Sequence, residues 1–354
     1  MIDIWFQFIR YSLDDTQPLP EDIERMDWAG LFWFCQEQAI AGVVFHTIEK
    51  LKNERIEIPR EVLLQWFVLS EQIKHHNVLL NKRCVGLVEL LKKDGFQSCI
   101  LKGQGNSIMY PNPYSRNPGD IDLWVFGGRT NVTKYIKNRF PHTGTAYQHI
   151  DFPIFKDVPV EIHYLPIYVN NPFYNRRLQK WFAAREKEQC NHYVDLPDGV
   201  GKIPVPTIDF NIVYQLVHIM HHFFDEGIGL RQMIDYYYLL KSDGGWMEDI
   251  SDTLKYLNLY NFAGAVMYIM KEVLGLEEKY LIVPVDERRG KTLLNEVLKG
   301  GNFGKYSGLT QHSVGAKFFL KIWRNLHFVR EYPVEALCEP FFRTWHFFWR
   351  LTHR

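Results

Sequence analysis

Cysteine is scarce in this sequence, and the arrangement of the few cysteines argues against two kinds of structure that cysteines can form, a disulfide framework and a zinc knuckle. The 354 residues include five cysteines, and no two of them form a CxxC pair: Cys35, Cys84, Cys99, Cys190 and Cys338. An odd number of widely spaced cysteines fits neither a disulfide framework nor a zinc knuckle. We therefore expect a reducing, cytoplasmic setting.

Long apolar runs and an excess of charge of either sign are also absent. No stretch approaches the roughly 18 uncharged apolar residues of a spanning helix, so none is predicted. The segment MIDIWFQFIRYSL carries Asp3 and no basic leader, which favours a first helix over a signal peptide. The 41 basic and 41 acidic side chains cancel. This balance gives no support for a dedicated duplex-DNA binder, because such binding depends largely on phosphate neutralisation.

Helical periodicity dominates both ends of the chain. At roughly 150 residues per domain the length suggests two or three domains, and we expect a helical region at 1–95, an α/β core at 96–206 and a helical domain at 207–354. The clearest helix covers 61–94, where apolar residues recur at three- and four-residue steps, followed by Gly95 as a C-terminal cap. These apolar residues are Trp66, Leu69, Ile73, Leu80, Cys84, Leu87 and Leu91.

The middle of the chain has a different sequence pattern, in which short apolar runs are separated by turn residues. We expect strands at 96–102, 120–126, 148–155 and 158–164, the last two forming a hairpin, with helices at 103–110 and 130–140 and a loop at 197–206. The predicted fold class is therefore α+β, a small mixed sheet flanked by N- and C-terminal helical segments.

Three acidic residues lie on the predicted strands. Alternation places Asp120 and Asp122 on one face, about 6–7 Å apart at Cα, with Ile121 directed into the core. Glu161 stands between apolar residues on a later strand, where a charge needs a partner. If that strand pairs beside 120–126, the three carboxylates meet, and such hard oxygen ligands suit Mg²⁺ or Mn²⁺.

A glycine-containing turn precedes these acids. Between a strand and a short helix, the turn from Lys102 to Ser107 can present backbone N–H groups to a triphosphate. Its residues are Lys102, Gly103, Gln104, Gly105, Asn106 and Ser107. A pair of aspartates or a glycine turn alone is common by chance, and the order and spacing of the whole set carry the hypothesis.

The run ILKGQGNSIMYPNPYSRNPGDIDLWV resembles the signature of the uncharacterised bacterial nucleotidyltransferases of the polymerase β-like superfamily. In that pattern a strand ends in KG, and a tyrosine–proline, an arginine and a DIDLxV strand follow. The superfamily's glycine, paired acids and third acid fall on Gly103, on Asp120 with Asp122, and on Glu161. The resemblance covers about 97–165, under a quarter of the chain. Gln104 departs from it, because the superfamily usually has Gly or Ser there.

The resemblance implies the transfer of an NMP from an NTP to an acceptor hydroxyl, with Mg²⁺ or Mn²⁺ held by the three carboxylates. It makes Lys102 and Arg116 candidate phosphate contacts, although each equally fits a solvated loop cation. The acceptor stays open among a small molecule, an RNA and a protein. Two alternatives also stay open: a non-catalytic nucleotide-binding or scaffold relative, and a toxin-type nucleotidyltransferase that acts on tRNA or protein.

Two further clusters have both a functional and a structural interpretation. His218, His221 and His222 share one helical face, which favours either substrate binding across the cleft, with a zinc site as a weaker alternative, or a hydrogen-bonded helix contact. Arg231 either faces the nucleotide or pairs with Asp235 four residues later.

The C-terminal segment combines aromatic and basic side chains, as in KFFLKIWRNLHFVREY. It fits contact with a membrane surface or a nucleic-acid groove. We favour helices whose aromatic residues are buried against the domain, with the basic residues outside.

Overall fold

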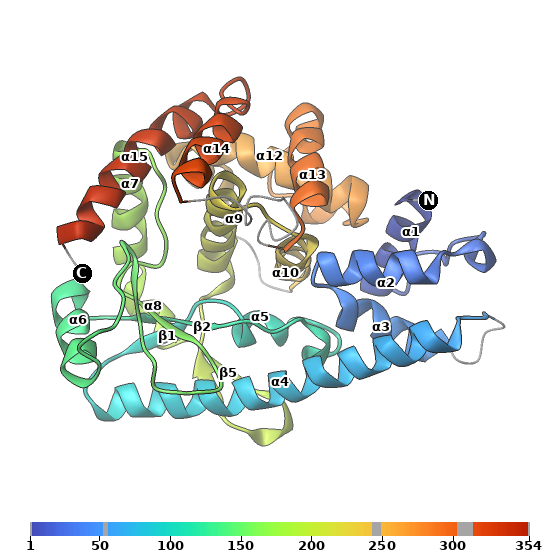
Figure 1. The fold of residues 1–354 in the computed structure, drawn as a ribbon, viewed down its shortest axis with the longest axis horizontal. Coiled ribbons are helices and arrows are strands. Elements are labelled where there is room, and N and C mark those ends of the chain that lie inside the picture. Colours follow the sequence, from blue (N-terminus) through green and yellow to red (C-terminus); the bar gives the residue numbers. More distant parts are fainter. Residues whose placement is uncertain (1, 52–55, 243–248, 303–313, 353–354) are drawn as a thin grey trace.

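The computed structural model describes residues 2–51, 56–242, 249–302 and 314–352 (Figure 1). The N-terminal part is helical, as expected, and its elements are α1 (Ile2–Leu13), η1 (Ile23–Arg25), α2 (Trp28–Glu37), α3 (Ala41–Lys50) and α4 (Arg60–Lys93). The long helix α4 runs along the lower edge of the view in Figure 1. Gly95 follows it with a φ of 86° and donates its N–H to the carbonyl of Lys92, which confirms the predicted cap.

The middle of the chain forms a small mixed sheet. Its elements are β1 (Ser98–Ile100), α5 (Gln104–Ser107), η3 (Pro113–Ser115), β2 (Ile121–Val125), α6 (Gly128–Arg139), β3 (His149–Asp151) and β4 (Val160–His163). The strand order is β1-β2-β4-β3. Strands β1 and β3 are antiparallel to their neighbours, whereas β2 and β4 are parallel. The predicted α+β class and the β3–β4 hairpin are confirmed.

A second, two-stranded sheet was not predicted. After α7 (Pro172–Ala183) and α8 (Glu186–Gln189), strand β5 (Tyr193–Asp195) pairs antiparallel with β6 (Lys202–Pro204) around η4 (Pro197–Gly199). The expectation of loop throughout 197–206 is therefore wrong at β6. Strands of three residues are too short to show alternation, and the neighbouring prolines and glycines conceal them.

Helices make up the rest of the described chain. They are α9 (Ile208–Asp225), α10 (Leu230–Lys241), α11 (Ile250–Tyr256), α12 (Tyr260–Tyr268), η5 (Ile269–Val273), η6 (Glu278–Tyr280), α13 (Glu287–Gly300), α14 (Val314–Leu326) and α15 (Pro333–Thr352). In the described ranges no helix combines the length and the apolar character needed to cross a membrane. A hydrophobic core joins the N-terminal helices to α9–α13, and it includes Phe8, Phe32, Phe210, Tyr236 and Leu293.

The sheet separates apolar from polar side chains by strand alternation. On one face, Ile121, Leu123 and Ile162 join a core with Leu87 of α4 and Ile136 of α6. The residues between them in sequence point to the opposite face, towards α9. The register pairs Asp122 with Glu161 and His149 with His163, so four polar residues share that second face.

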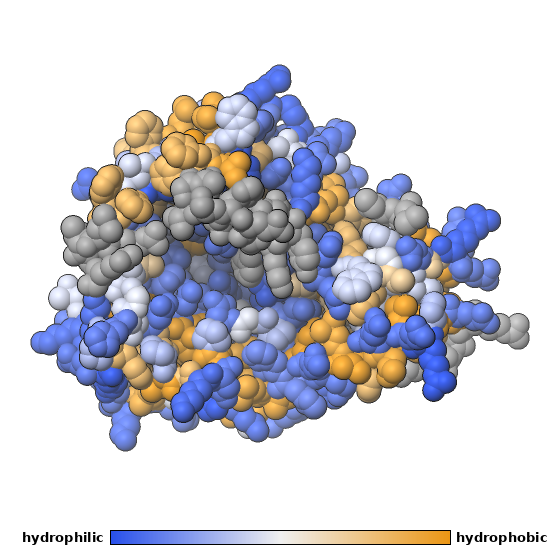
Figure 2. Space-filling view, viewed as in Figure 1, coloured by the Kyte–Doolittle hydropathy of each residue, from blue (hydrophilic) through white to orange (hydrophobic). Residues whose placement is uncertain are grey.

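The aromatic C-terminal helices reverse the favoured expectation. Several of their large apolar side chains are exposed: Phe319, Trp323, Phe341, Trp345 and Phe348. Figure 2 shows apolar side chains gathered at the upper left, where α14 and α15 lie. The basic residues Lys321 and Arg343 instead turn inward to Asp225 of α9, at 3.0 and 2.8 Å. Because ion pairs attach these helices to α9, their aromatic residues are not all needed for packing.

Candidate functional site

Three carboxylates converge where β2 and β4 lie side by side. The oxygens of Asp120, Asp122 and Glu161 lie within 4.8 Å of one another. Asp120 directly precedes β2, Asp122 lies on it, and Glu161 is the register partner of Asp122 on β4. The charge on Asp122, together with burial, raises the pKa of Asp120. The cluster thus concentrates negative charge at one point of the sheet.

Lys102 contacts this cluster from the turn after β1. Its Nζ lies 3.1 Å from Asp122 Oδ2 and 3.0 Å from Nε2 of His218 on α9. Burial opposes its charge, but Asp122 and Asp120 outweigh burial, and the pKa of Lys102 is raised. Lys102 therefore carries a charge that balances part of the carboxylate cluster.

Two histidines extend the cluster along β4 and β3. His163 Nε2 lies 3.0 Å from Asp122 Oδ1 and 3.5 Å from Glu161 Oε2. Burial disfavours charge on His163, but its hydrogen bonds to the two carboxylates raise its pKa to about 9. Across the strand pair, His149 Nδ1 lies 3.2 Å from Glu161 Oε2. Burial, and then the charge of His163, lower the pKa of His149.

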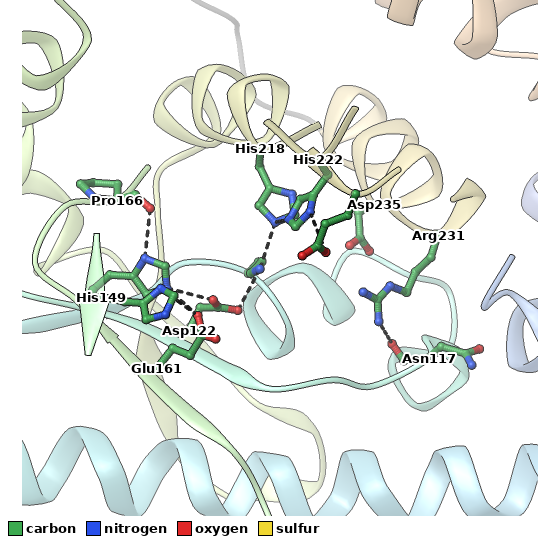
Figure 3. Close-up of polar contacts among 12 residues, drawn as sticks. Asn117, Asp122, His149, Glu161, Pro166, His218, His222, Arg231 and Asp235 are labelled. Carbon is green, nitrogen blue, oxygen red and sulfur yellow. Dashed lines mark hydrogen bonds and ion pairs between the residues drawn. The ribbon is translucent and has the colours of Figure 1, made fainter. Parts of the chain in front are cut away.

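His218 and His222 of α9 lie at the site (Figure 3). His222 Nε2 lies 3.0 Å from His218 Nε2, the same atom that Lys102 contacts. Because a lysine ammonium only donates, His218 Nε2 is the acceptor in its contact with Lys102. Burial and then Lys102 lower the pKa of His218 well below its usual value. Among the described residues, the groups with metal-ligand spacing do not include the α9 histidines.

Arg116 forms a buried bidentate ion pair with Asp235 of α10. Its Nε and its terminal nitrogen each lie 2.7 Å from a different carboxylate oxygen. Sequence spacing suggested Arg231 as one possible partner of Asp235 and did not indicate Arg116. Arg231 donates to the carbonyl of Asn117 at 3.4 Å (Figure 3) and lines a cavity with Asp120. This ion pair therefore holds the loop before β2 against α10.

The turn residues separate into two groups. Gly103, with a φ of 62°, lies beside the backbone of Asp120 and lines the cavity. The Gln104 amide bonds Asn81 of α4, and the Ser107 hydroxyl donates to the Gln104 carbonyl at 2.9 Å. Gly105 faces Val205. The side chains of Gln104 and Ser107 therefore stabilise the turn, while Gly103 faces the carboxylates.

Two cavities meet at the carboxylates. A narrow one lies towards α10 and is lined by Lys102, Gly103, Arg116, Asp120, Asp122 and Arg231, among others. A wider one, of about 400 Å³, lies between the sheet and α9 and is lined by Tyr147, Glu161, His163, Tyr168, His218 and His222, among others. Both are lined by Lys102, Asp120 and Asp122. The narrow cavity, of about 20 Å³, has room for little more than one water, whereas the wider one can receive a small molecule beside the carboxylates.

Sequence reasoning missed His149 and His163. A signal was present, because each residue alternates with an apolar neighbour on its strand, in HID and in EIH. Only the β3–β4 register brings the two rings together, with centroids 5.3 Å apart.

Comparisons with known proteins bear on the family to which the chain belongs. The sequence model of a family described as uncharacterised nucleotidyltransferase matches residues 24–275. Among solved structures, the chain is similar to an antigenic nucleotidyltransferase-like protein from Paracoccidioides brasiliensis, with 11% identity and a TM-score of 0.37. That similarity covers 58% of this chain and 94% of the other. No curated protein matches the chain.

Proposed function

The chain belongs to the family of uncharacterised nucleotidyltransferases, and from this premise we propose a metal-dependent enzyme that transfers an NMP from an NTP to an acceptor hydroxyl. The observation that carries the proposal is the convergence of Asp120, Asp122 and Glu161, with donor oxygens within 4.8 Å of one another. Carboxylates that converge beside an open cavity can hold the metal ions that stabilise the attacking and leaving oxygens of a phosphoryl transfer.

These residues fit a divalent cation. Asp122 is buried, and its negative charge is the main reason for the raised pKa of Asp120. A cation held by Asp120, Asp122 and Glu161 would relieve this repulsion, and oxygen ligands suit Mg²⁺ or Mn²⁺. When bound, such an ion neutralises charge on the transferring phosphoryl group.

We infer the roles of the neighbouring residues from the cavity that each of them lines. Gly103 and Arg231 line the narrow cavity, whose volume of about 20 Å³ is too small for a triphosphate, but their backbone and guanidinium suit contact with one phosphate of an NTP held at the carboxylates. Glu161 lines only the wider of these two cavities, and its side chain is 30% exposed. We therefore place the acceptor hydroxyl on the Glu161 side. Lys102 lines both cavities and holds a positive charge between them.

The proposal is tested by an Asp120→Asn, Asp122→Asn double variant. We expect loss of metal-dependent NTP binding in calorimetry and loss of labelled-NMP transfer in a lysate that supplies the acceptor. The matched control is an Asp195→Asn, Asp252→Asn double variant, whose native side chains are 77% and 79% exposed. Circular dichroism verifies that both variants fold.

Two outcomes contradict the proposal. Unchanged Mg·NTP affinity in the folded Asp120→Asn, Asp122→Asn variant would remove these carboxylates from metal and nucleotide binding. Failure of the wild-type chain to bind any of the four NTPs with Mg²⁺ or Mn²⁺ would favour a non-catalytic role.

A further inference from the structure

A second group of potential metal ligands lies beside the carboxylates. One donor atom each from His149, Glu161 and His163 lies within 4.8 Å of the other two. The three residues come from the β3–β4 hairpin, where His149 is the register partner of His163 and Glu161 precedes His163 by two residues on the same face. Figure 3 shows His149 and Glu161 close together beside Asp122.

The spacing of the donor atoms fits a single small cation. Ligand bonds of about 2.0–2.1 Å in a tetrahedral site place neighbouring donors about 3.3 Å apart. His149 Nδ1 and His163 Nε2 lie 3.2 and 3.5 Å from Glu161 Oε2. His149 Nδ1 is buried and forms no hydrogen bond of standard geometry within the described chain, despite this short contact. Only small shifts would direct all three donors at one ion.

The ring of His163 is held in the orientation that a ligand needs. Its Nδ1 lies 3.2 Å from the carbonyl oxygen of Pro166 (Figure 3). A carbonyl only accepts, so Nδ1 carries a proton. Nε2 faces Asp122 Oδ1 at 3.0 Å and Glu161 Oε2 at 3.5 Å, and a metal would take the place of the proton that Nε2 shares with these carboxylates. Metal-binding histidines commonly donate their other N–H to a backbone carbonyl in this way, which fixes both the tautomer and the ring.

We propose that His149, Glu161 and His163 form a second cation site, selective for a borderline transition metal of the Zn²⁺ type. Two imidazoles and one carboxylate favour such an ion over Mg²⁺, which takes oxygen ligands. Three protein ligands leave a position open for water or a substrate oxygen. Glu161 belongs to both metal groups, so it is the residue that would link the two ions.

This proposal concerns metal binding alone and does not depend on nucleotide transfer. The competing arrangement is a doubly protonated His163 that bonds Asp122 and Glu161 and excludes a metal. The two arrangements differ in whether nitrogen coordinates the ion, which is measurable without nucleotide or acceptor.

The test is a titration of metal-free protein with Zn²⁺ by calorimetry and with Co²⁺ by visible absorption. We expect the wild-type chain to give the intense absorption of four- or five-coordinate Co²⁺. His149→Gln should weaken Zn²⁺ binding by more than about tenfold, the lower end of what loss of even an outer-shell partner costs. His142→Gln, at an exposed position, is the matched control.

Asp120→Asn separates this proposal from the nucleotidyltransferase proposal. Asp120 belongs to the carboxylate group and not to the His149 group, so the variant should lose Mg·NTP binding and keep Zn²⁺ binding. Unchanged Zn²⁺ affinity in folded His149→Gln, or a weak octahedral Co²⁺ spectrum in the wild type, overturns the second site.

If His149→Gln does not fold, the wild-type chain still decides the question. Zn²⁺ should protect His149 and His163 from diethyl pyrocarbonate, measured by peptide mass spectrometry, while His142 reacts at the same rate with and without metal. Equal modification of all three with and without Zn²⁺ would refute the site.

Discussion

The buried pair between Arg116 and Asp235 should contribute strongly to stability, and it can be tested without knowledge of any substrate. Both side chains are only 5% exposed. Asp235 also accepts a hydrogen bond of 2.6 Å from the hydroxyl of Tyr110. In Arg116→Met the carboxylate keeps Tyr110 but loses its bidentate partner. Removal of one member of a buried pair costs about 3–5 kcal/mol when the remaining charge is uncompensated. The charge of Arg231 also acts on Asp235, so we expect the lower end of this range for Arg116→Met.

The measurement is urea unfolding followed by tryptophan fluorescence and by circular dichroism, whose coincidence establishes a single transition. Arg116→Met and Asp235→Leu should each lower the free energy of unfolding by about 3–5 kcal/mol. The double variant should be more stable than the summed losses predict, by about 1–3 kcal/mol, because it leaves neither charge without its partner.

The control is the exposed pair Lys255–Asp252, whose side chains are 57% and 79% exposed. Lys255→Met should cost far less stability than Arg116→Met, since solvent screens such a pair. A similarly small loss in Arg116→Met would refute the reasoning, as would strict additivity of the Arg116 and Asp235 variants.

Three further predictions concern other parts of the chain. Burial raises the pKa of Glu335 to about 7, so its ionisation should cost stability as pH rises from about 4.5 through 7, by up to roughly 3 kcal/mol. Glu335→Gln should abolish this loss, measured by urea unfolding at pH 5 and pH 8. Equal pH dependence of stability in both proteins would contradict the prediction. Gly103→Ala should lower the free energy of unfolding by about 1–3 kcal/mol because of the φ of 62°. Gly86→Ala, at a helical position with open space around it, should raise the free energy of unfolding by up to about 1 kcal/mol. Melting curves in which Gly103→Ala is the more stable of the two variants would exclude backbone strain at Gly103. The structure describes all five cysteines, and Cys338 alone is not buried. Burial raises the pKa of the Cys84 thiol, so a thiol reagent should modify one cysteine, Cys338, in the native protein. A fast phase of thiol modification that survives in Cys338→Ser would contradict this.

The elements that the sequence predicted well are those with strong periodicity. Helix α4 begins at Arg60 and ends at Lys93, close to the predicted bounds, because its buried residues repeat at helical spacing. The β3–β4 hairpin followed from alternation, although its strands are shorter than expected. Strands β5 and β6 were missed because three residues carry too little pattern.

The site was predictable only in part. Spacing and family resemblance singled out Asp120, Asp122 and Glu161, and the structure brings them together, while their catalytic role stays a prediction. The partner of Asp235 was not predictable, because Arg116 lies on a loop far away in the chain. His149 was missed for the same reason, since the order of the strands in the sheet is a long-range property that local patterns do not encode.

The parallel pairing of β2 with β4 has a consequence for how the site comes into being. Asp122 and Glu161 meet only when the intervening chain, which contains α6 and β3, brings the two strands together. Non-local strand pairing of this kind forms slowly. A chain still emerging from the ribosome therefore holds its aspartates before it holds all three carboxylates of the proposed metal site, and cation binding there would report the completion of the sheet.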